Sequence, residues 1–223
     1  MDINIVGICG SHRRGNTLKM IESSLEAARE IKNVSTDLIH LKNISHCIAC
    51  KKCPSNQPGK ICNLSDQMDE IYPKLIQCDG IIIGSPVYYG NVNSLTKAFI
   101  DRWRSLGKSG SLLKFKVGGA IAVGGCRHGG QEKTISTIID SYLMSGICPT
   151  GLSYPPIIGA CGVAFNQKDV LNDVWYHSTK NQHVSAIQEA RQIGLGVALL
   201  SKIIKTGLKE VNVAKELKFF MSH

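Results

Sequence analysis

The stretch that decides the fold is residues 80–92, Gly-Ile-Ile-Ile-Gly-Ser-Pro-Val-Tyr-Tyr-Gly-Asn-Val. Its run Ile81-Ile82-Ile83 places apolar side chains on both faces of a strand, as in a parallel strand that is covered by helices above and below. Small residues, a proline and two tyrosines follow the run at once, which is typical of a loop. We therefore predict a buried parallel strand over Gly80–Ser85.

The rest of the chain alternates apolar runs of strand length with amphipathic stretches of helix length, which predicts an α/β domain. The expected strands are Ile3–Cys9, Ser35–Leu41, Gly80–Ser85, Val117–Val123 and Ile147–Leu152. The expected helices are Thr17–Ile31, Asp66–Ile76 with Ser65 as N-cap, one that starts near Asn93-Ser94 and carries Leu95, Ala98, Phe99 and Trp103, Gln131–Ser145, and Ser185–Lys205.

Five such strands with helices between them fit a doubly wound parallel sheet of order 2-1-3-4-5, whose ligand loops follow strands one, three and four at the carboxyl edge. A chain of 223 residues with 43% hydrophobic residues can bury one sizeable core. We expect one domain over residues 1–205, with a cysteine-rich loop at 46–63, and a helical tail at 206–223.

No stretch of the sequence predicts export or a membrane span. The first strand follows Asp2 without a basic leader, and the apolar stretch Ile193–Leu200 is far shorter than the ~20 residues that a membrane helix needs. Nine cysteines, an odd number, favour a reducing compartment. We therefore expect a cytoplasmic protein with no membrane segment.

The formal net charge of +9 favours anionic partners such as flavin phosphates, nucleotide cofactors, an acidic redox protein or nucleic acid. Basic residues are mostly scattered along the chain and aromatic residues make up only 6% of it, which argues against nucleic-acid binding.

The loop after the first strand, residues 10–17, leads directly into a helix. Backbone N–H groups at the helix start, the hydroxyls of Ser11 and Thr17 and the amide of Asn16 can donate to a phosphate, and Arg13 adds charge. The alternative is a plain turn with Asn16 or Thr17 as N-cap. Because the loop matches neither a Walker loop nor the G-x-G-x-x-G pattern, a phosphomonoester such as that of FMN fits it better.

Two further loops are expected at the same edge. In residues 84–92, small residues let backbone amides approach a flat ring, and Tyr88 or Tyr89 can stack on it; an ordinary loop with exposed tyrosines is the alternative. Residues 124–132 contain four glycines within seven residues, which indicates close backbone approach to a ligand. Together, the three loops predict a flavin site.

Through GSHRRGNT, GSPVYYGNV and GGCRHGGQE the sequence resembles the NADPH-dependent FMN reductase-like superfamily of flavodoxin-like proteins, over nearly the whole chain. The resemblance implies a flavodoxin-like fold with a C-terminal helical extension, and FMN as cofactor. It implies that the FMN phosphate is held by Ser11, Arg13, Asn16 and Thr17. It also implies that the isoalloxazine is bordered by Pro86, Val87, Tyr88, Tyr89, Gly90 and Asn91, with Gly125 and Arg127.

Four cysteines of the loop after strand two follow the pattern C-x2-C-x2-C-x8-C, at Cys47, Cys50, Cys53 and Cys62. Three thiols at two-residue gaps can converge on an inorganic cube, and a fourth completes a [4Fe–4S] site. Structural zinc, which usually pairs two separated knuckles, and unmetallated thiols are the alternatives.

The loop resembles that of the iron–sulfur flavoproteins of anaerobic archaea and bacteria, whose last gap is usually shorter, and this implies FMN plus a [4Fe–4S] cluster. Of the other cysteines, Cys9, Cys78, Cys148 and Cys161 are expected to be small buried residues, while Cys126 falls in the third flavin loop.

We therefore predict an FMN-dependent oxidoreductase that couples two-electron flavin chemistry to a one-electron cluster, with no catalytic histidine or aspartate. An NAD(P)H-dependent FMN or quinone reductase without a cluster is the main alternative, and a flavin-free binding module is a weaker one. The resemblance implies a homodimer or homotetramer, with the C-terminal helix and residues 154–183 as candidate interfaces. Lys51 and Lys52 could attract an acidic donor such as ferredoxin, or merely keep the loop soluble; NAD(P)H is the other donor.

Overall fold

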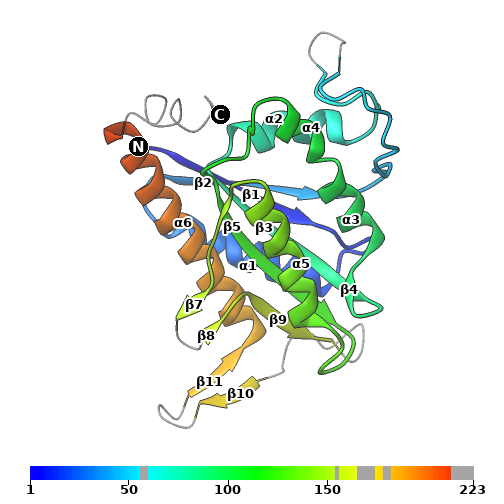
Figure 1. Ribbon diagram of the computed structural model, residues 1–223. Coiled ribbons are helices and arrows are strands. Elements are labelled where there is room, and N and C mark those ends of the chain that lie inside the picture. The colour runs from blue at the N-terminus through cyan, green and yellow to red at the C-terminus, as the bar shows by residue number, and fades with distance from the viewer. Residues whose placement is uncertain (56–59, 154–155, 165–173, 178–181, 212–223) are drawn as a thin grey trace.

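The computed structural model describes residues 1–55, 60–153, 156–164, 174–177 and 182–211 (Figure 1). The strands are β1 (Ile3–Cys9), β2 (Val34–His40), β3 (Gly80–Tyr88), β4 (Asn91–Val92), β5 (Val117–Gly124), β6 (Cys148–Pro149), β7 (Leu152–Ser153), β8 (Pro156–Ile157), β9 (Ala160–Val163), β10 (Val174–His177) and β11 (Gln182–Ser185). The helices are α1 (Asn16–Arg29), α2 (Met68–Gln77), α3 (Ser94–Asp101), α4 (Arg104–Lys108), α5 (Gln131–Met144) and α6 (Ala186–Glu210).

The main sheet has the order β2-β1-β3-β5-β6, and these strands pair in parallel. This confirms the predicted doubly wound order. The fifth position differs from the prediction, because β6 covers only Cys148–Pro149 and β9 then takes over the pairing with β5. Cys148 N and Thr150 N still donate to the carbonyls of Lys116 and Gly118, both at 2.8 Å, and beyond Thr150 the chain leaves the sheet and returns at Ala160.

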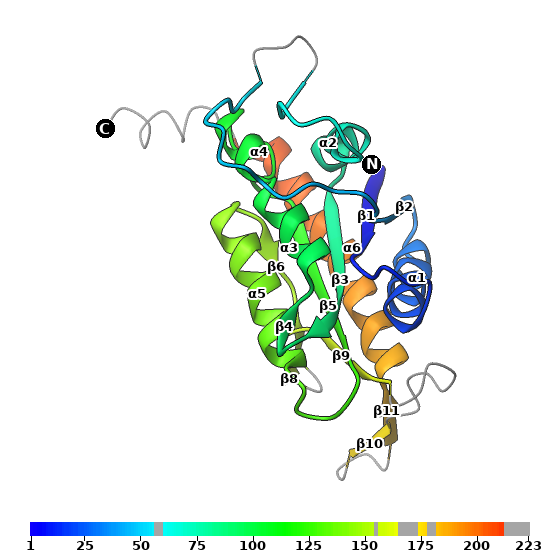
Figure 2. The same cartoon turned by 90° about the vertical axis from the view of Figure 1, so that its right-hand side faces the viewer.

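Helices cover both faces of the sheet, which Figure 2 shows from its side. Ile81 and Ile83 point into one core, which they share with residues of α2 to α5 such as Phe99 and Tyr142. Ile82 points into the other core, with residues of α1 and α6. The prediction that the central strand is buried on both faces is confirmed.

The predicted N-cap of the second helix was wrong. The helix starts at Met68, whose N–H donates to Asp66 Oδ1 at 2.9 Å, while the Ser65 hydroxyl accepts from Lys60. Asp66 takes the capping role because its carboxylate also has a buried partner, described below.

The other helix starts agree with the sequence. The Asn93 side chain caps α3 by accepting from Thr96 N at 3.1 Å, and Ser185 caps α6 in a capping box with Gln188. α3 ends at Asp101, so the predicted face that reaches Trp103 spans the junction to α4.

The last helix, α6, continues without a break through Lys205 to Glu210. Residues 212–223 of the predicted tail and much of the candidate interface at 154–183 lie outside the described residues. Within the described ranges, no helix combines the length and the apolar character that a membrane crossing requires.

Candidate functional site

The loop from β1 to α1 presents an uncapped helix start. Gly15 is the N-cap of α1 and makes no side-chain cap hydrogen bond, so the first N–H groups of the helix are available to an anion. Asn16 and Thr17 lie inside the first turn of α1, so the alternative in which one of them caps the helix is not what the structure shows. Ser11 and Thr17 are buried, and the Ser11 hydroxyl accepts from Arg13 N at 3.1 Å.

A cavity of about 400 Å³ opens beside this helix start, at the carboxyl ends of β1, β3 and β5. All four predicted phosphate-binding residues and four of the predicted ring-bordering residues line it, which brings the three loops to one site. The lining residues are Ser11, Arg13, Arg14, Gly15, Asn16, Thr17, Pro86, Val87, Tyr88, Val123, Gly124, Gly125 and Ala164. The hydroxyls, the arginine and the free helix N–H groups form a donor set that fits a phosphomonoester.

Four predicted residues do not line this cavity: Tyr89, Gly90, Asn91 and Arg127. β3 runs on to Tyr88 and turns back into β4, which carries Tyr89 fully into solvent. The Asn91 side-chain oxygen Oδ1 accepts from Thr137 Oγ1 in α5 at 2.7 Å. A Cβ on Gly130, whose φ is +111°, would lie 2.4 Å from Gly90 Cα, so the second and third loops pack directly on each other.

Sequence reasoning missed His40, at the end of β2. Its ring nitrogen Nε2 lies 2.5 Å from the Ser11 carbonyl oxygen, and its main-chain carbonyl accepts from Gln67 Nε2 at 3.0 Å. The buried Nδ1 has no hydrogen-bond partner among the described residues. A single histidine at a strand end carries no signal for this contact, and Ala164, which lines the cavity from beyond β9, carries none either.

The cysteine loop connects β2 to α2 and contains neither helix nor strand in its described part. Cys62 is buried, Cys47, Cys50 and Cys53 are half-buried, and all four thiols are free. Ala49 and Lys51, on either side of Cys50, have φ values of +50° and +59°. Backbone that alternates in handedness turns successive N–H groups toward one side, as around bound anions and iron–sulfur clusters.

The Cys53 thiol is influenced by the other three thiols. Burial raises the pKa of the Cys53 thiol, and Cys62, Cys50 and Cys47 raise it further. No group of three or more His, Cys, Asp or Glu side chains in the described ranges is arranged to hold a single metal ion. Thiols that bind separate corners of a cube need not converge as the ligands of one ion must. The donor set is therefore chemically suited to a cluster.

The remaining cysteines differ in exposure. Cys9 and Cys78 are buried, as predicted, and burial raises their pKa values to about 11 and about 12. Cys148 and Cys161 are only half-buried, and Cys126 is exposed.

A larger cavity of about 1010 Å³ lies beside Cys47, between α3, α4 and the end of α5. It contains none of the predicted flavin residues, and apolar side chains such as Trp103, Leu113 and Met144 contribute to its lining. Its size does not make it the flavin site, because the candidate phosphate donors lie elsewhere.

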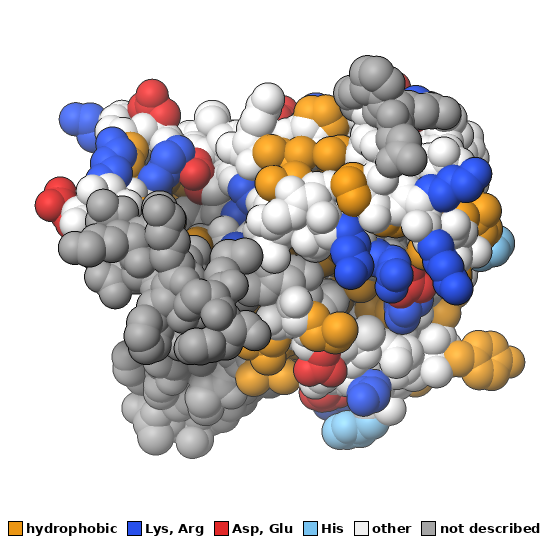
Figure 3. Space-filling model, turned by 45° about the horizontal axis from the view of Figure 1, so that its top comes forward, with side chains coloured by type: hydrophobic (Ala, Val, Ile, Leu, Met, Phe, Trp, Pro, Cys, Tyr) orange, Lys and Arg blue, Asp and Glu red, His pale blue; other side chains and the backbone are white. Residues whose placement is uncertain are grey.

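Figure 3 shows Lys and Arg side chains gathered beside hydrophobic ones on the right of the face in view.

Comparison with known proteins agrees with this geometry. Residues 3–150 match the sequence model of the NADPH-dependent FMN reductase family. An iron–sulfur flavoprotein of Methanocaldococcus jannaschii is 38% identical over 207 residues, which cover 91% of this chain and 100% of the relative. An iron–sulfur flavoprotein of Methanosarcina thermophila is 42% identical over 150 residues, 67% of this chain and 78% of the relative.

The fold also resembles solved structures. A flavodoxin, WrbA-like protein from Agrobacterium tumefaciens superposes with a TM-score of 0.60 at 17% identity, covering 91% of this chain and 98% of that chain. At that identity the likeness concerns the flavodoxin-like fold.

Proposed function

The chain belongs to the NADPH-dependent FMN reductase family and is a flavin-dependent oxidoreductase, and from this premise we propose that it transfers electrons between FMN and a [4Fe–4S] cluster. The observation that carries the flavin half of the proposal is the cavity at which three loops, far apart in the sequence, meet beside an uncapped helix start. FMN, when bound, accepts two electrons as a hydride or passes them singly.

The chain's own residues divide the work of holding FMN. Ser11, Thr17 and the first N–H groups of α1 donate to the phosphate, and Arg13 and Asn16 line the same end of the cavity. Pro86, Val87, Tyr88 and Gly125 border the ring from the other two loops. In this proposal Gly90 and Asn91 support the loops from behind, as the packing of Gly90 on Gly130 and the hydrogen bond from Thr137 to Asn91 indicate. For Tyr89 and Arg127, which do not line the cavity, the place beside the ring stays a prediction.

Cys47, Cys50, Cys53 and Cys62 are the proposed cluster ligands. Support comes from their spacing, from the effect of the other three thiols on the pKa of Cys53 and from the backbone turns on either side of Cys50. The names of two relatives at 38% and 42% identity, both iron–sulfur flavoproteins, support the same assignment. A cluster of this type passes one electron at a time, so the pair would convert two-electron into one-electron chemistry.

A plain NAD(P)H-dependent FMN or quinone reductase is the second candidate. It is favoured by the flavin cavity, which contains none of the four proposed ligand cysteines and is complete without a cluster.

Cys50→Ser separates the two candidates. After anaerobic purification and reconstitution, the wild-type chain should hold about four irons and four acid-labile sulfides beside FMN. The Cys50→Ser variant should lose iron and sulfide but keep the yellow flavin spectrum, because Cys50 lies outside the flavin cavity. Cys126→Ser, in an exposed cysteine of the third loop, is the matched control and should keep both cofactors. Wild-type protein that stays free of iron would leave the plain reductase.

The remaining proposals concern partners and context. An acidic one-electron carrier such as ferredoxin docks at the exposed Lys51 and Lys52, with NAD(P)H as the other donor. The chain works in the cytoplasm as a homodimer or homotetramer, with a flavin-binding domain at 1–205 and a C-terminal tail at 206–223.

A further inference from the structure

We propose that Arg102, just beyond the end of α3, is a positioning residue for the cluster. With Asp66 it clamps both stems of the cysteine loop, which are the segments that enter the loop at Ser45 and leave it at Leu64, and so fixes the spacing of the four thiols. The inference rests on the proposed function, because it concerns the same cysteine loop. It assigns a role to a residue that lies 36 positions from Asp66 in the sequence and outside every motif of the chain.

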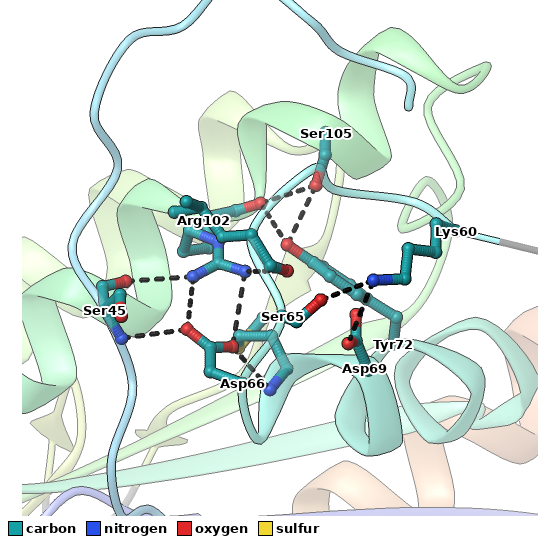
Figure 4. Close-up of polar contacts among 10 residues, drawn as sticks. Ser45, Lys60, Ser65, Asp66, Asp69, Tyr72, Arg102 and Ser105 are labelled. Atoms are coloured by element: carbon teal, nitrogen blue, oxygen red, sulfur yellow. Dashed lines mark hydrogen bonds and ion pairs between the residues drawn. The ribbon is translucent and has the colours of Figure 1, made fainter. Parts of the chain in front are cut away.

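The centre of the clamp is a buried ion pair, which Figure 4 shows. The Arg102 side chain is 1% exposed and that of Asp66 is 7% exposed. The guanidinium donates to Asp66 Oδ2 at 2.7 Å and more weakly to Oδ1 at 3.3 Å. Burial alone would raise the pKa of Asp66, but hydrogen bonds from Arg102, Ser45 N and Met68 N hold it below its ordinary value, so the pair is ionised at neutral pH.

One guanidinium reaches both stems of the loop. Arg102 Nη1 donates to the Ser45 carbonyl at 3.0 Å, and Asp66 Oδ2 accepts from Ser45 N at 2.9 Å, so the chain is held at both main-chain groups two residues before Cys47. Arg102 Nη2 contacts the Leu64 carbonyl at 3.4 Å, two residues after Cys62. All four cysteines lie between these two anchored points.

The base of the clamp is tied to α2. The Tyr72 hydroxyl donates to the Arg102 carbonyl at 3.1 Å, and the Ser105 hydroxyl lies 2.8 Å from the same carbonyl oxygen and 3.0 Å from the Tyr72 hydroxyl (Figure 4). Lower down the stems, Gln67 Oε1 accepts from Lys42 N at 2.6 Å. Because the described part of the loop has no helix or strand of its own, these side chains determine where it starts and ends.

A lysine at position 102 would keep the charge but not the forked geometry, because only a guanidinium can donate to a carboxylate and to two carbonyls at fixed angles. Arg102→Lys therefore tests positioning apart from charge. The double variant Arg102→Met/Asp66→Asn avoids leaving either charge buried alone and provides a second, foldable test. Lys97→Met, in the exposed pair with Asp101 on α3, is the matched control.

The measurements are iron release to a chelator, hydrogen exchange of residues 41–55 and 60–67 before cluster reconstitution, and FMN content. Both clamp variants should release iron faster than the wild type, by roughly 10- to 100-fold, which is the usual loss in metal affinity when a residue that orients metal ligands is replaced, taken here as a change in the release rate. In both clamp variants the loop stems should exchange faster, while the FMN content stays at the wild-type value. In the control Lys97→Met, iron release, stem exchange and FMN content should all stay at wild-type values.

Wild-type rates of iron release in both clamp variants would overturn the proposal. It would also be overturned if iron release rose while stem exchange did not, because the effect would then not pass through the stems. A wild-type chain that takes up no iron would overturn the cluster itself, and this outcome is recognised before any variant is made.

Discussion

Two hydroxyls, those of Ser11 and Thr17, are expected to determine how tightly the chain holds FMN. Both are buried at the cavity beside the start of α1. Ser11→Ala with Thr17→Val removes two donors and keeps the shape of the threonine. Because each hydrogen bond to a charged group is worth about 1.5–3 kcal/mol, the dissociation constant for FMN should rise at least about tenfold.

Titration of the apoprotein with FMN, followed by flavin fluorescence, measures this effect. Ser136→Ala, whose hydroxyl donates to the Glu132 carbonyl within α5 and lies outside the cavity, should leave the constant unchanged. An unchanged constant in the double variant would show that the phosphate lies elsewhere.

At the scale of elements, α1 and α6 pack closely on each other. A Cβ on Gly194 of α6 would lie 1.8 Å from the Ser24 carbonyl oxygen of α1, which is main chain and has no rotamer to change. Gly194→Ala should therefore push the helices apart and lower the free energy of unfolding by about 1–3 kcal/mol. Gly207→Ala, in the same helix with open space around it, should raise that free energy by up to about 1 kcal/mol.

Urea unfolding of the three proteins provides the comparison. If Gly194→Ala and Gly207→Ala changed stability alike, helix propensity rather than helix contact would govern the position.

The elements that the sequence predicted well are those whose signal is local. β1 has the predicted bounds because its largely apolar run of strand length is bounded by Asp2 and Gly10. The proposed phosphate-binding loop could be predicted because its candidate donors lie within eight residues of one helix start.

The elements that could not be predicted depend on distant partners. No sequence feature of residues 147–152 predicts that β9 will take the place of β6 beside β5. The extension of β3 to Tyr88 depends on β4, and Asp66 replaces Ser65 at the start of α2 because Arg102, 36 residues away, fixes its carboxylate. Propensity carries no information about such contacts.

At the scale of the whole molecule, the net charge of +9 should govern the encounter with a small acidic electron carrier. Electron transfer from reduced ferredoxin should slow steeply between low salt and ~0.15 M, where the screening length falls to ~8 Å. Lys51→Glu/Lys52→Glu, in exposed residues of the cysteine loop, should slow it further without loss of iron or FMN.

Stopped-flow measurement at several salt concentrations tests the docking site. Lys32→Glu/Lys209→Glu changes the net charge equally at exposed residues near the helices of the other sheet face, and should have a smaller effect. Equal slowing by the two double variants would assign the effect to total charge, and a wild-type rate in Lys51→Glu/Lys52→Glu at low salt would exclude docking at the loop.

The two stems of the cysteine loop lie side by side, because Lys42 N donates a hydrogen bond to Gln67 Oε1 and Ser45 N donates one to Asp66 Oδ2. The described residues between 42 and 67 form no strand or helix, so this segment is one long connection from β2 to α2 whose two ends lie side by side. In genetic terms it is a cassette whose two ends lie together, but Ile44, Ile61, Cys62 and Leu64 pack it against the core, so a shorter connection from β2 to α2 would need new side chains in their place. The same two stems would allow the segment to be transplanted onto another flavodoxin-like chain, bringing its four thiols as one unit.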